Sequence, residues 1–321
     1  MPGAHVLDCV NYMPERVVRN DAAAAHRGVR ERRFASPQYT SGELGALAAK
    51  KLLDRNVVSP ASIDLVIAAS VLTDFMNYGI GADVLHRIGA TNANLLNLDT
   101  NCTSWIGALN VARAFVESKI YKRILIVTVT NLVSRLTEFQ ELEGSWSLGD
   151  GASATLMVAD DGRREGAILA LDERSFGELY GHMRLESAPD SEGRRLEYWQ
   201  SGKEPLAIHL SDGMIPERAT RALPEAIRRV LHACDLSTSD VALLLTHQPD
   251  RVTIDGWRSA LGIDPSRAHD TLEIYGNMSM GSIPVTLADA IDNCMVNRGD
   301  LIVTAAFANA GDHVSAMAMR W

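Results

Sequence analysis

The chain contains 321 residues with a formal net charge of −9, and its 46% hydrophobic content supplies a large buried core, so we expect two domains or one duplicated core. The acidic balance argues against a nucleic-acid partner, and four cysteines without a C-x-x-C pair exclude a disulfide framework and a zinc knuckle. No apolar run reaches membrane-span length and the first residues lack signal-peptide features, which predicts a cytoplasmic protein without a membrane partner.

The predicted elements follow one order in both halves of the chain. In the first half, a helical segment around 50–53 precedes the apolar strand 64–70, and another strand, 95–98, ends just before Cys102. An offset of 176 residues superimposes three elements on later ones without a gap, which indicates an internal duplication. The matched segments are 64–70 with 240–246, 109–115 with 285–291, and 125–128 with 301–304.

The repeated strands are rich in Val, Ile, Leu and Ala, which is typical of parallel strands covered by helices on both faces. We therefore predict an α/β protein made of two similar halves packed together. Residues 1–160 form the first half and 215–321 the second, and the Gly- and charge-rich stretch 161–214 is a connecting excursion.

Cys102 lies where the strand 95–98 ends and a helix begins. Unpaired backbone N–H groups in the first turn of a helix carry partial positive charge and stabilise a thiolate. Free cysteines usually serve as small buried hydrophobes, and we assign that role to Cys9, Cys234 and Cys294. Cys102 differs because potential partners exist, and the sequence predicts that it is a nucleophile.

Two polar residues lie at corresponding strand ends in the second half. His247 closes an apolar run, and Asn277 follows Gly276 and coincides with Asn101 at the offset of 176 residues. Considered alone, His247 is typical of a hydrogen-bonded residue in the core or at its rim, and Asn277 is typical of a residue in a turn or at a helix N-cap. Because ligands gather where strand ends of both halves meet, we expect Cys102, His247 and Asn277 to converge on one pocket.

At these residues the chain resembles the ketoacyl-ACP synthase III group of the thiolase-fold condensing enzymes. Gly28–Ala35 is similar to the signature GIRERRxA, and Gly149–Ala152 to the turn GDGA. His247–Asp250 is similar to HQAN, and Gly276–Pro284 to GNTSAASIP. The resemblance covers nearly the whole length and implies a thiolase-like fold, in which two duplicated α/β halves form a layered αβαβα core.

The resemblance also implies a ping-pong acyl transfer. Cys102 would accept an acyl group from a CoA or carrier-protein thioester, while its own N–H and one from Ala308 or Asn309 hold the oxyanion. His247 and Asn277 would then donate hydrogen bonds to a malonyl-type thioester as CO2 departs. The family pattern further implies a homodimer, with no bound cofactor and no metal. We expect the strand after the Cys102 helix to continue the sheet across the twofold interface.

The chain departs from the family pattern in two places. It is shorter between Asn20 and Gly28 and lacks the tryptophan segment that stacks on the adenine of CoA, and residues 307–311 replace a glycine-rich run. These departures favour a specialised enzyme of secondary metabolism. The predicted substrate contacts are Arg27, Arg30, Arg32 and Arg33 for phosphates, and Trp105 and Phe307 for the acyl group.

Two other functions stay open. On the same fold, the acyl group can pass from Cys102 to a hydroxyl or amine acceptor without loss of CO2. A chain of this type can also be a non-catalytic partner subunit of a heteromeric synthase. Retention of Cys102, His247 and Asn277 argues against the second of these.

Overall fold

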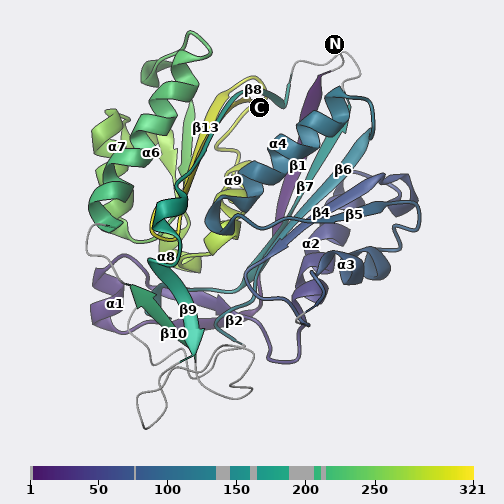
Figure 1. The fold of residues 1–321 in the computed structure, drawn as a ribbon, viewed down its shortest axis with the longest axis horizontal. Coiled ribbons are helices and arrows are strands. Elements are labelled where there is room, and N and C mark those ends of the chain that lie inside the picture. The colour runs from purple at the N-terminus through teal and green to yellow at the C-terminus, as the bar shows by residue number, and fades with distance from the viewer. Residues whose placement is uncertain (1–2, 76, 135–144, 160–164, 188–205, 211–214) are drawn as a thin grey trace.

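The computed structural model describes residues 3–75, 77–134, 145–159, 165–187, 206–210 and 215–321, and Figure 1 shows their arrangement. The strands of the central sheet are β1 (Ala4–Tyr12), β4 (Leu65–Ser70), β5 (Asn94–Asn97), β6 (Arg123–Thr130), β7 (Gly151–Ala159), β8 (Ala167–Ser175), β11 (Leu243–Thr246), β12 (Ala268–His269), β13 (Leu301–Ala308) and β14 (His313–Arg320). Their order is β12-β11-β13-β14-β8-β1-β7-β6-β4-β5.

This sheet consists of two halves with the same pattern. In the first, β4 pairs in parallel with β5 and β6, while β7 pairs antiparallel with β6 and β1. In the second, β11 pairs in parallel with β12 and β13, while β14 pairs antiparallel with β13 and β8. The pair His5 and Ala167 joins β1 to β8 at the boundary.

Helices cover both halves and separate them, as Figure 1 shows. Helices α2 (Ser41–Arg55) and α3 (Gly81–Ile88) pack on the outer face of the first half, and α6 (Ile215–His232) and α7 (Arg251–Leu261) on that of the second. Between the halves lie α4 (Ser104–Glu117) and α9 (Ser282–Asp292), whose apolar side chains share one buried cluster with both halves of the sheet. The predicted αβαβα core is confirmed.

The element boundaries correct the offset of the duplication. The starts of β4 and β11, of α4 and α9, and of β6 and β13 are each 178 residues apart, two more than the sequence match gave. Side chains of a strand alternate with a period of two, so a shift of two residues keeps every apolar position matched. The two central helices are apolar on almost all sides, so their apolar residues also match each other at either offset.

Two expectations about the sheet were wrong. β8 lies inside the stretch assigned to a connecting excursion, yet it pairs with β14 along its length. Its position next to β14 in the second half corresponds to the position of β1 next to β7 in the first. The strand after the Cys102 helix is β6, which lies between β4 and β7 and has no free edge. The free edge of the first half belongs to β5. The remaining domain boundaries stay a prediction.

Smaller elements lie around this core. They are β2 (Arg16–Arg19), α1 (Ala22–His26), β3 (Glu31–Phe34), β9 (Met183–Ser187), β10 (Leu206–Leu210) and α8 (Leu272–Tyr275). β2 pairs with β3, and β9 pairs with β10. Val29 from the loop between α1 and β3 packs against Ile254 of α7 and Leu272 of α8, so this N-terminal segment rests on the second half of the chain.

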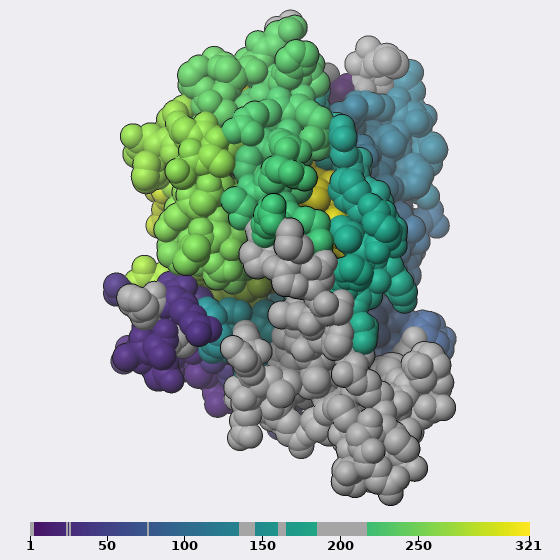
Figure 2. All heavy atoms as spheres, turned by 60° about the vertical axis from the view of Figure 1, so that its left-hand side comes forward, coloured from purple at the N-terminus to yellow at the C-terminus, as the bar shows by residue number. Residues whose placement is uncertain are grey.

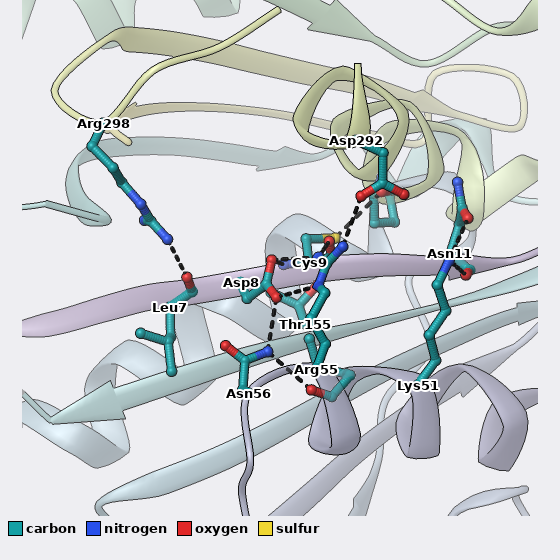
Figure 3. Close-up of polar contacts among 12 residues, drawn as sticks. Leu7, Asp8, Cys9, Asn11, Lys51, Arg55, Asn56, Thr155, Asp292 and Arg298 are labelled. Carbon is teal, nitrogen blue, oxygen red and sulfur yellow. Dashed lines mark hydrogen bonds and ion pairs between the residues drawn. The ribbon is translucent and has the colours of Figure 1, made fainter. Parts of the chain in front are cut away.

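A partly exposed ionic link joins the two halves (Figure 3). Arg55, the last residue of α2, donates hydrogen bonds to Asp8 of β1 at 2.7 and 2.5 Å and to Asp292 of α9 at 2.7 Å. The Cys9 thiol lies beside this link and donates to the carbonyl of Pro284 at 3.3 Å. Burial raises the pKa of Cys9 to about 12, so this thiol stays protonated and inert, as predicted.

Candidate active site

Cys102 lies in a tight turn between β5 and α4. A short 3-10 helix over Asn101–Thr103 leads into α4, and Asn101 has a φ of 51°, in the left-handed region that asparagine tolerates best after glycine. The Ser104 hydroxyl closes this turn by donating to the carbonyl of Asn101 at 2.7 Å and accepting from the N–H of Thr100 at 2.9 Å. The sequence predicted this placement at the start of the helix.

Three groups from distant segments surround the half-buried thiol. The Oγ of Ser279 lies 3.5 Å from the Sγ of Cys102, and hydrogen bonds from the His247 side chain and the Asn309 backbone N–H complete the set. Burial raises the pKa of Cys102, but the charge of His247 and these three hydrogen bonds outweigh burial, so the pKa lies below its ordinary value. A thiol in these surroundings is more acidic than an ordinary cysteine, which suits the predicted role of a nucleophile.

His247 directly follows β11. Its N–H donates to the carbonyl of Ala305 on β13 at 2.9 Å, and its side chain is 5% exposed. Gln248 holds the next turn by donating to Thr286 of α9 at 2.5 Å and accepting from the N–H of Thr271 at 3.1 Å. These buried contacts fix the backbone at His247 and so the position of its imidazole.

Asn277 is held from both sides by the 145–151 segment. Its N–H donates to the carbonyl of Ser147 at 2.6 Å, and its carbonyl accepts from Gly149 at 3.3 Å. Its side-chain oxygen accepts from the N–H of Ser279 at 2.8 Å, so the amide NH2 group is the end left for a ligand. A Cβ on Gly149 would lie 2.2 Å from the carbonyl oxygen of Tyr275, so glycine is required for this close approach.

The C-terminal loop contributes the donor from Asn309. Asn309 has a φ of 43°, and its side chain donates to Asp312 at 3.1 Å. Of the two residues predicted to complete an oxyanion hole, Asn309 directs its N–H to the sulfur, whereas Ala308 is buried and its carbonyl accepts from Gly311 at 2.7 Å. The sequence did not predict two further contacts at the site. They are the contact of the Ser279 hydroxyl with Cys102 and a hydrogen bond between Thr103 and His313.

Three of the predicted substrate contacts are placed elsewhere. Arg32 is 7% exposed and donates to the side chain of Asn20 and to the carbonyls of Ser145 and Leu148, so it braces the loop rather than offering a phosphate contact. Trp105 is 1% exposed in the central core and donates to Thr155 at 2.9 Å. Phe307 packs in the cluster beneath α6 and α7. An aromatic residue close in sequence to a nucleophile can point into either face of its element.

The other three arginines lie on the outside of the N-terminal segment. Arg27 stacks over the ring of Trp146 at 5.3 Å, and Arg30 forms an ion pair with Glu273 at 2.8 Å. Arg33 lies 5.8 Å from the centre of the Tyr275 ring and is a quarter exposed. Figure 2 shows this segment, in purple, beside the lime-green α7.

Within the described ranges, no group of three or more His, Cys, Asp and Glu side chains could hold a metal ion. None of the helices in that same part of the chain is long and apolar enough to span a membrane.

A cysteine at the start of the central helix α4, within a duplicated five-layer α/β core, defines a condensing enzyme of the thiolase fold. Models of the family 3-oxoacyl-[acyl-carrier-protein (ACP)] synthase III match residues 96–177, and those of its C-terminal part match residues 231–321. The chain belongs to this family, and it is an acyl-transferring condensing enzyme, a ketosynthase.

Individual relatives agree with this assignment. The β-ketoacyl-ACP synthase III of Symbiobacterium thermophilum is 30% identical over 325 residues, covering 96% of this chain and 95% of the relative, and that of Gloeobacter violaceus is 30% identical over 311 residues, covering 97% and 93%. The crystal structure of the synthase III from Aquifex aeolicus VF5 has a TM-score of 0.84 at 25% identity, covering 99% of this chain and 100% of that one. The Pseudomonas aeruginosa PAO1 structure has the same fold, with a TM-score of 0.87.

Proposed function

We propose that this ketosynthase works by a ping-pong, decarboxylative condensation on Cys102. The observation that carries the proposal is the set of donors around the Cys102 sulfur, which lowers its pKa and faces the place where an acyl carbonyl must bind. The acyl donor is a thioester of CoA or of an acyl carrier protein, and no bound cofactor takes part.

In the first half-reaction, the Cys102 thiolate attacks the thioester carbonyl. The negative charge that develops on the oxygen is held by the backbone N–H groups of Cys102 and Asn309. The bond to the donor thiol then breaks, the thiol leaves as a thiolate and takes up a proton, and the acyl group stays on Cys102.

In the second half-reaction, a malonyl-type thioester enters. His247 and the NH2 group of Asn277 donate hydrogen bonds to its thioester carbonyl, which stabilises the enolate formed as the bond to CO2 breaks. The enolate carbon attacks the acyl carbonyl, and the tetrahedral intermediate collapses with Cys102 leaving as a thiolate. The hydrogen bond from Ser279 to the Asn277 oxygen supports this role, because it turns the NH2 group away from its own backbone.

The donor is recognised at the N-terminal segment. Arg27, Arg30 and Arg33 are the predicted arginines that stay at the surface, and they suit the phosphates of CoA or the acidic groups of a carrier protein. The shortened segment between Asn20 and Gly28 supports a specialised role in secondary metabolism. Turnover of acetyl-CoA with malonyl-ACP at the rate of a housekeeping initiator would contradict that role.

The protein acts in the cytoplasm as a homodimer. We infer that the exposed edge of β5 pairs with its copy across a twofold axis, since Leu95 on this strand is 38% exposed and the nearby Phe75 and Tyr78 are 68% and 61% exposed.

The experiment combines mass spectrometry of Cys102 with release of CO2 from a carboxyl-labelled malonyl donor. The wild-type protein should gain one acyl mass from a panel of CoA and carrier-protein thioesters, and Cys102→Ala should gain none. Asn277→Ala should still be acylated but should lose about 100-fold or more in CO2 release, because it removes a donor to the enolate.

Each alternative predicts a different result. If the acyl group leaves Cys102 for a hydroxyl or amine while the malonyl donor stays intact, the decarboxylative reaction is wrong. If no thioester in the panel acylates Cys102, the chain is a non-catalytic subunit.

A further inference from the structure

The C-terminal loop is fastened to the residue after the nucleophile. His313, the first residue of β14, places its Nδ1 2.7 Å from the Oγ1 of Thr103, which directly follows Cys102 and is fully buried. The two residues are 210 positions apart, so this contact exists only in the folded chain.

The direction of this hydrogen bond follows from the single hydrogen that the Thr103 hydroxyl carries. The Thr103 hydroxyl has one hydrogen, and it donates to the carbonyl of Thr100 at 2.6 Å. The same oxygen therefore accepts from His313, which must carry its proton on Nδ1. Thr103 thus connects the nucleophile turn to the C-terminal loop.

The loop between His313 and β13 holds the second oxyanion donor. Asn309 adopts a left-handed φ of 43°, and its side chain donates to Asp312 at 3.1 Å. The carbonyl of Asp312 accepts from the N–H of Phe176 at 2.8 Å, and that of Ala310 accepts from Arg218 at 3.2 Å. These contacts hold the loop from the side of the second half, whereas His313 ties it to the half that carries Cys102.

We propose that Thr103 and His313 are positioning residues for the oxyanion hole. Their hydrogen bond sets the distance between the Asn309 N–H and Cys102, since one end of it is adjacent to Cys102 and the other follows the turn that presents Asn309. The inference rests on the proposed acylation of Cys102. Neither residue contacts the reacting atoms, so each acts through the backbone that it holds.

The test compares two reactions of Cys102. Acylation by acetyl-, isobutyryl- or octanoyl-CoA, whichever modifies the wild-type protein, passes through an oxyanion, whereas alkylation by iodoacetamide does not. Thr103→Val and His313→Leu should lower the single-turnover acylation rate by about 10- to 100-fold, less than the loss of an oxyanion donor itself. The maximal alkylation rate, taken from its pH profile, should stay within about 2-fold of the wild type.

Matched variants separate this role from damage to the fold. Thr103→Ser keeps the hydroxyl, and His313→Asn keeps an N–H donor near the position of Nδ1, so both should acylate within about 3-fold of the wild type. His232→Leu, at an exposed histidine on α6, is the control for loss of an imidazole. The double variant Thr103→Val/His313→Leu should be no slower than the slower single variant, because both remove the same hydrogen bond.

Several outcomes would overturn the proposal. Wild-type acylation in His313→Leu, effects that multiply in the double variant, or a parallel loss of acylation and alkylation would each do so. A 15N-histidine spectrum of the wild-type protein needs no variant, and an unprotonated Nδ1 on His313 would exclude the donation to Thr103 on which the proposal rests. Absence of any Cys102 adduct in the wild type would instead refute the proposed function, together with the positioning role that depends on it.

Discussion

Ser279 is the donor to Cys102 that the sequence did not single out. Its hydroxyl lies 3.5 Å from the sulfur, and its own N–H binds the side-chain oxygen of Asn277, so one residue orients two members of the site. A left-handed φ of 46°, unusual for serine, turns it toward both. No spacing rule identifies such a residue, because its role depends on a backbone conformation.

Replacing Ser279 by Ala should make Cys102 less acidic and less reactive. The pKa of Cys102 should rise toward its ordinary value of 9.0, since a hydrogen bond that favours the thiolate is lost. Acylation at pH 7 should fall by about 10-fold, as expected for one hydrogen bond to a charged group. The pH profile of iodoacetamide alkylation measures the shift, with Ser259→Ala on the exposed face of α7 as the control. An unchanged profile would show that Ser279 does not stabilise the thiolate.

The turn at Gly149–Gly151 is the element that joins the N-terminal segment to the site. Asp150, buried in this turn, accepts four backbone hydrogen bonds, from Ala35, Leu132, Val133 and Ser134, at 2.9 to 3.1 Å. Each of the two carboxyl oxygens accepts two of these hydrogen bonds. The motif therefore has a structural role, and it supports the backbone that binds Asn277.

Asp150→Asn should destabilise the protein by about 2–4 kcal/mol. An amide NH2 group would face two of the four N–H donors and leave them without partners, each at a cost of about 1–3 kcal/mol. Urea denaturation measures the loss, with Asp54→Asn on the exposed side of α2 as the matched control. A change below about 1 kcal/mol would mean that the turn relaxes around the amide.

A second carboxylate, 11% exposed, anchors the segment that leads to Asn277. Asp270 accepts from Arg251 at 2.7 and 2.8 Å and from Arg258 at 2.7 Å, which ties the end of β12 to α7. Burial raises the pKa of Asp270, but the two guanidinium groups outweigh burial, and the pKa lies below its ordinary value of 3.8.

This lowered pKa predicts a pH-dependent contribution to stability. The contribution is complete above the pKa of the unfolded state, near 4, and is lost as the pH falls through the lower folded-state pKa. Asp270→Asn should cost about 2–3 kcal/mol at pH 7. The difference in unfolding free energy between wild type and variant should be constant from pH 5 to 8 and shrink below pH 4. A difference that persists unchanged at pH 3 would refute this assignment.

The molecule as a whole is two copies of one α/β unit enclosing two apolar helices. The link from Arg55 to Asp8 and Asp292 ties the outer helix of the first half to α9, which begins directly after the 3-10 helix Ser279–Gly281. The relative placement of Cys102 and its partners is therefore fixed by the packing of whole halves. One edge of this assembly, β5, is left unpaired in the single chain.

Leu95→Arg should convert the proposed dimer into monomers. Charges repeated across a twofold axis repel each other, and the substitution also removes an apolar contact at the pairing edge. Light scattering coupled to size exclusion should give a mass near 34.9 kDa for the variant and twice that for the wild type. Ile120→Arg, at an exposed site away from this edge, should stay dimeric. A monomeric wild type, or a dimeric Leu95→Arg, would exclude pairing through β5.

The sequence alone determined the duplicated α/β core and the family, because apolar strands, central helices and short motifs are local patterns. It also placed Cys102 between a strand and a helix, and His247 directly after β11. Asn277, which was predicted at a strand end, instead follows the short helix α8. It could not fix the offset of the repeat, since strands match equally well after a shift of two residues. It also missed β8, whose mixed polar composition hides a strand that pairs on both sides.

Only the tertiary structure decided which side chains meet. It buried Arg32 and Trp105, which the sequence left free to contact substrate, and it brought Ser279 and His313 to the nucleophile turn across 177 and 210 residues. Such contacts depend on crossing angles and on left-handed residues in turns, and neither leaves a periodic trace in the sequence. Burial and hydrogen bonding across the two halves are properties of the assembled fold, and they determine the pKa of Cys102.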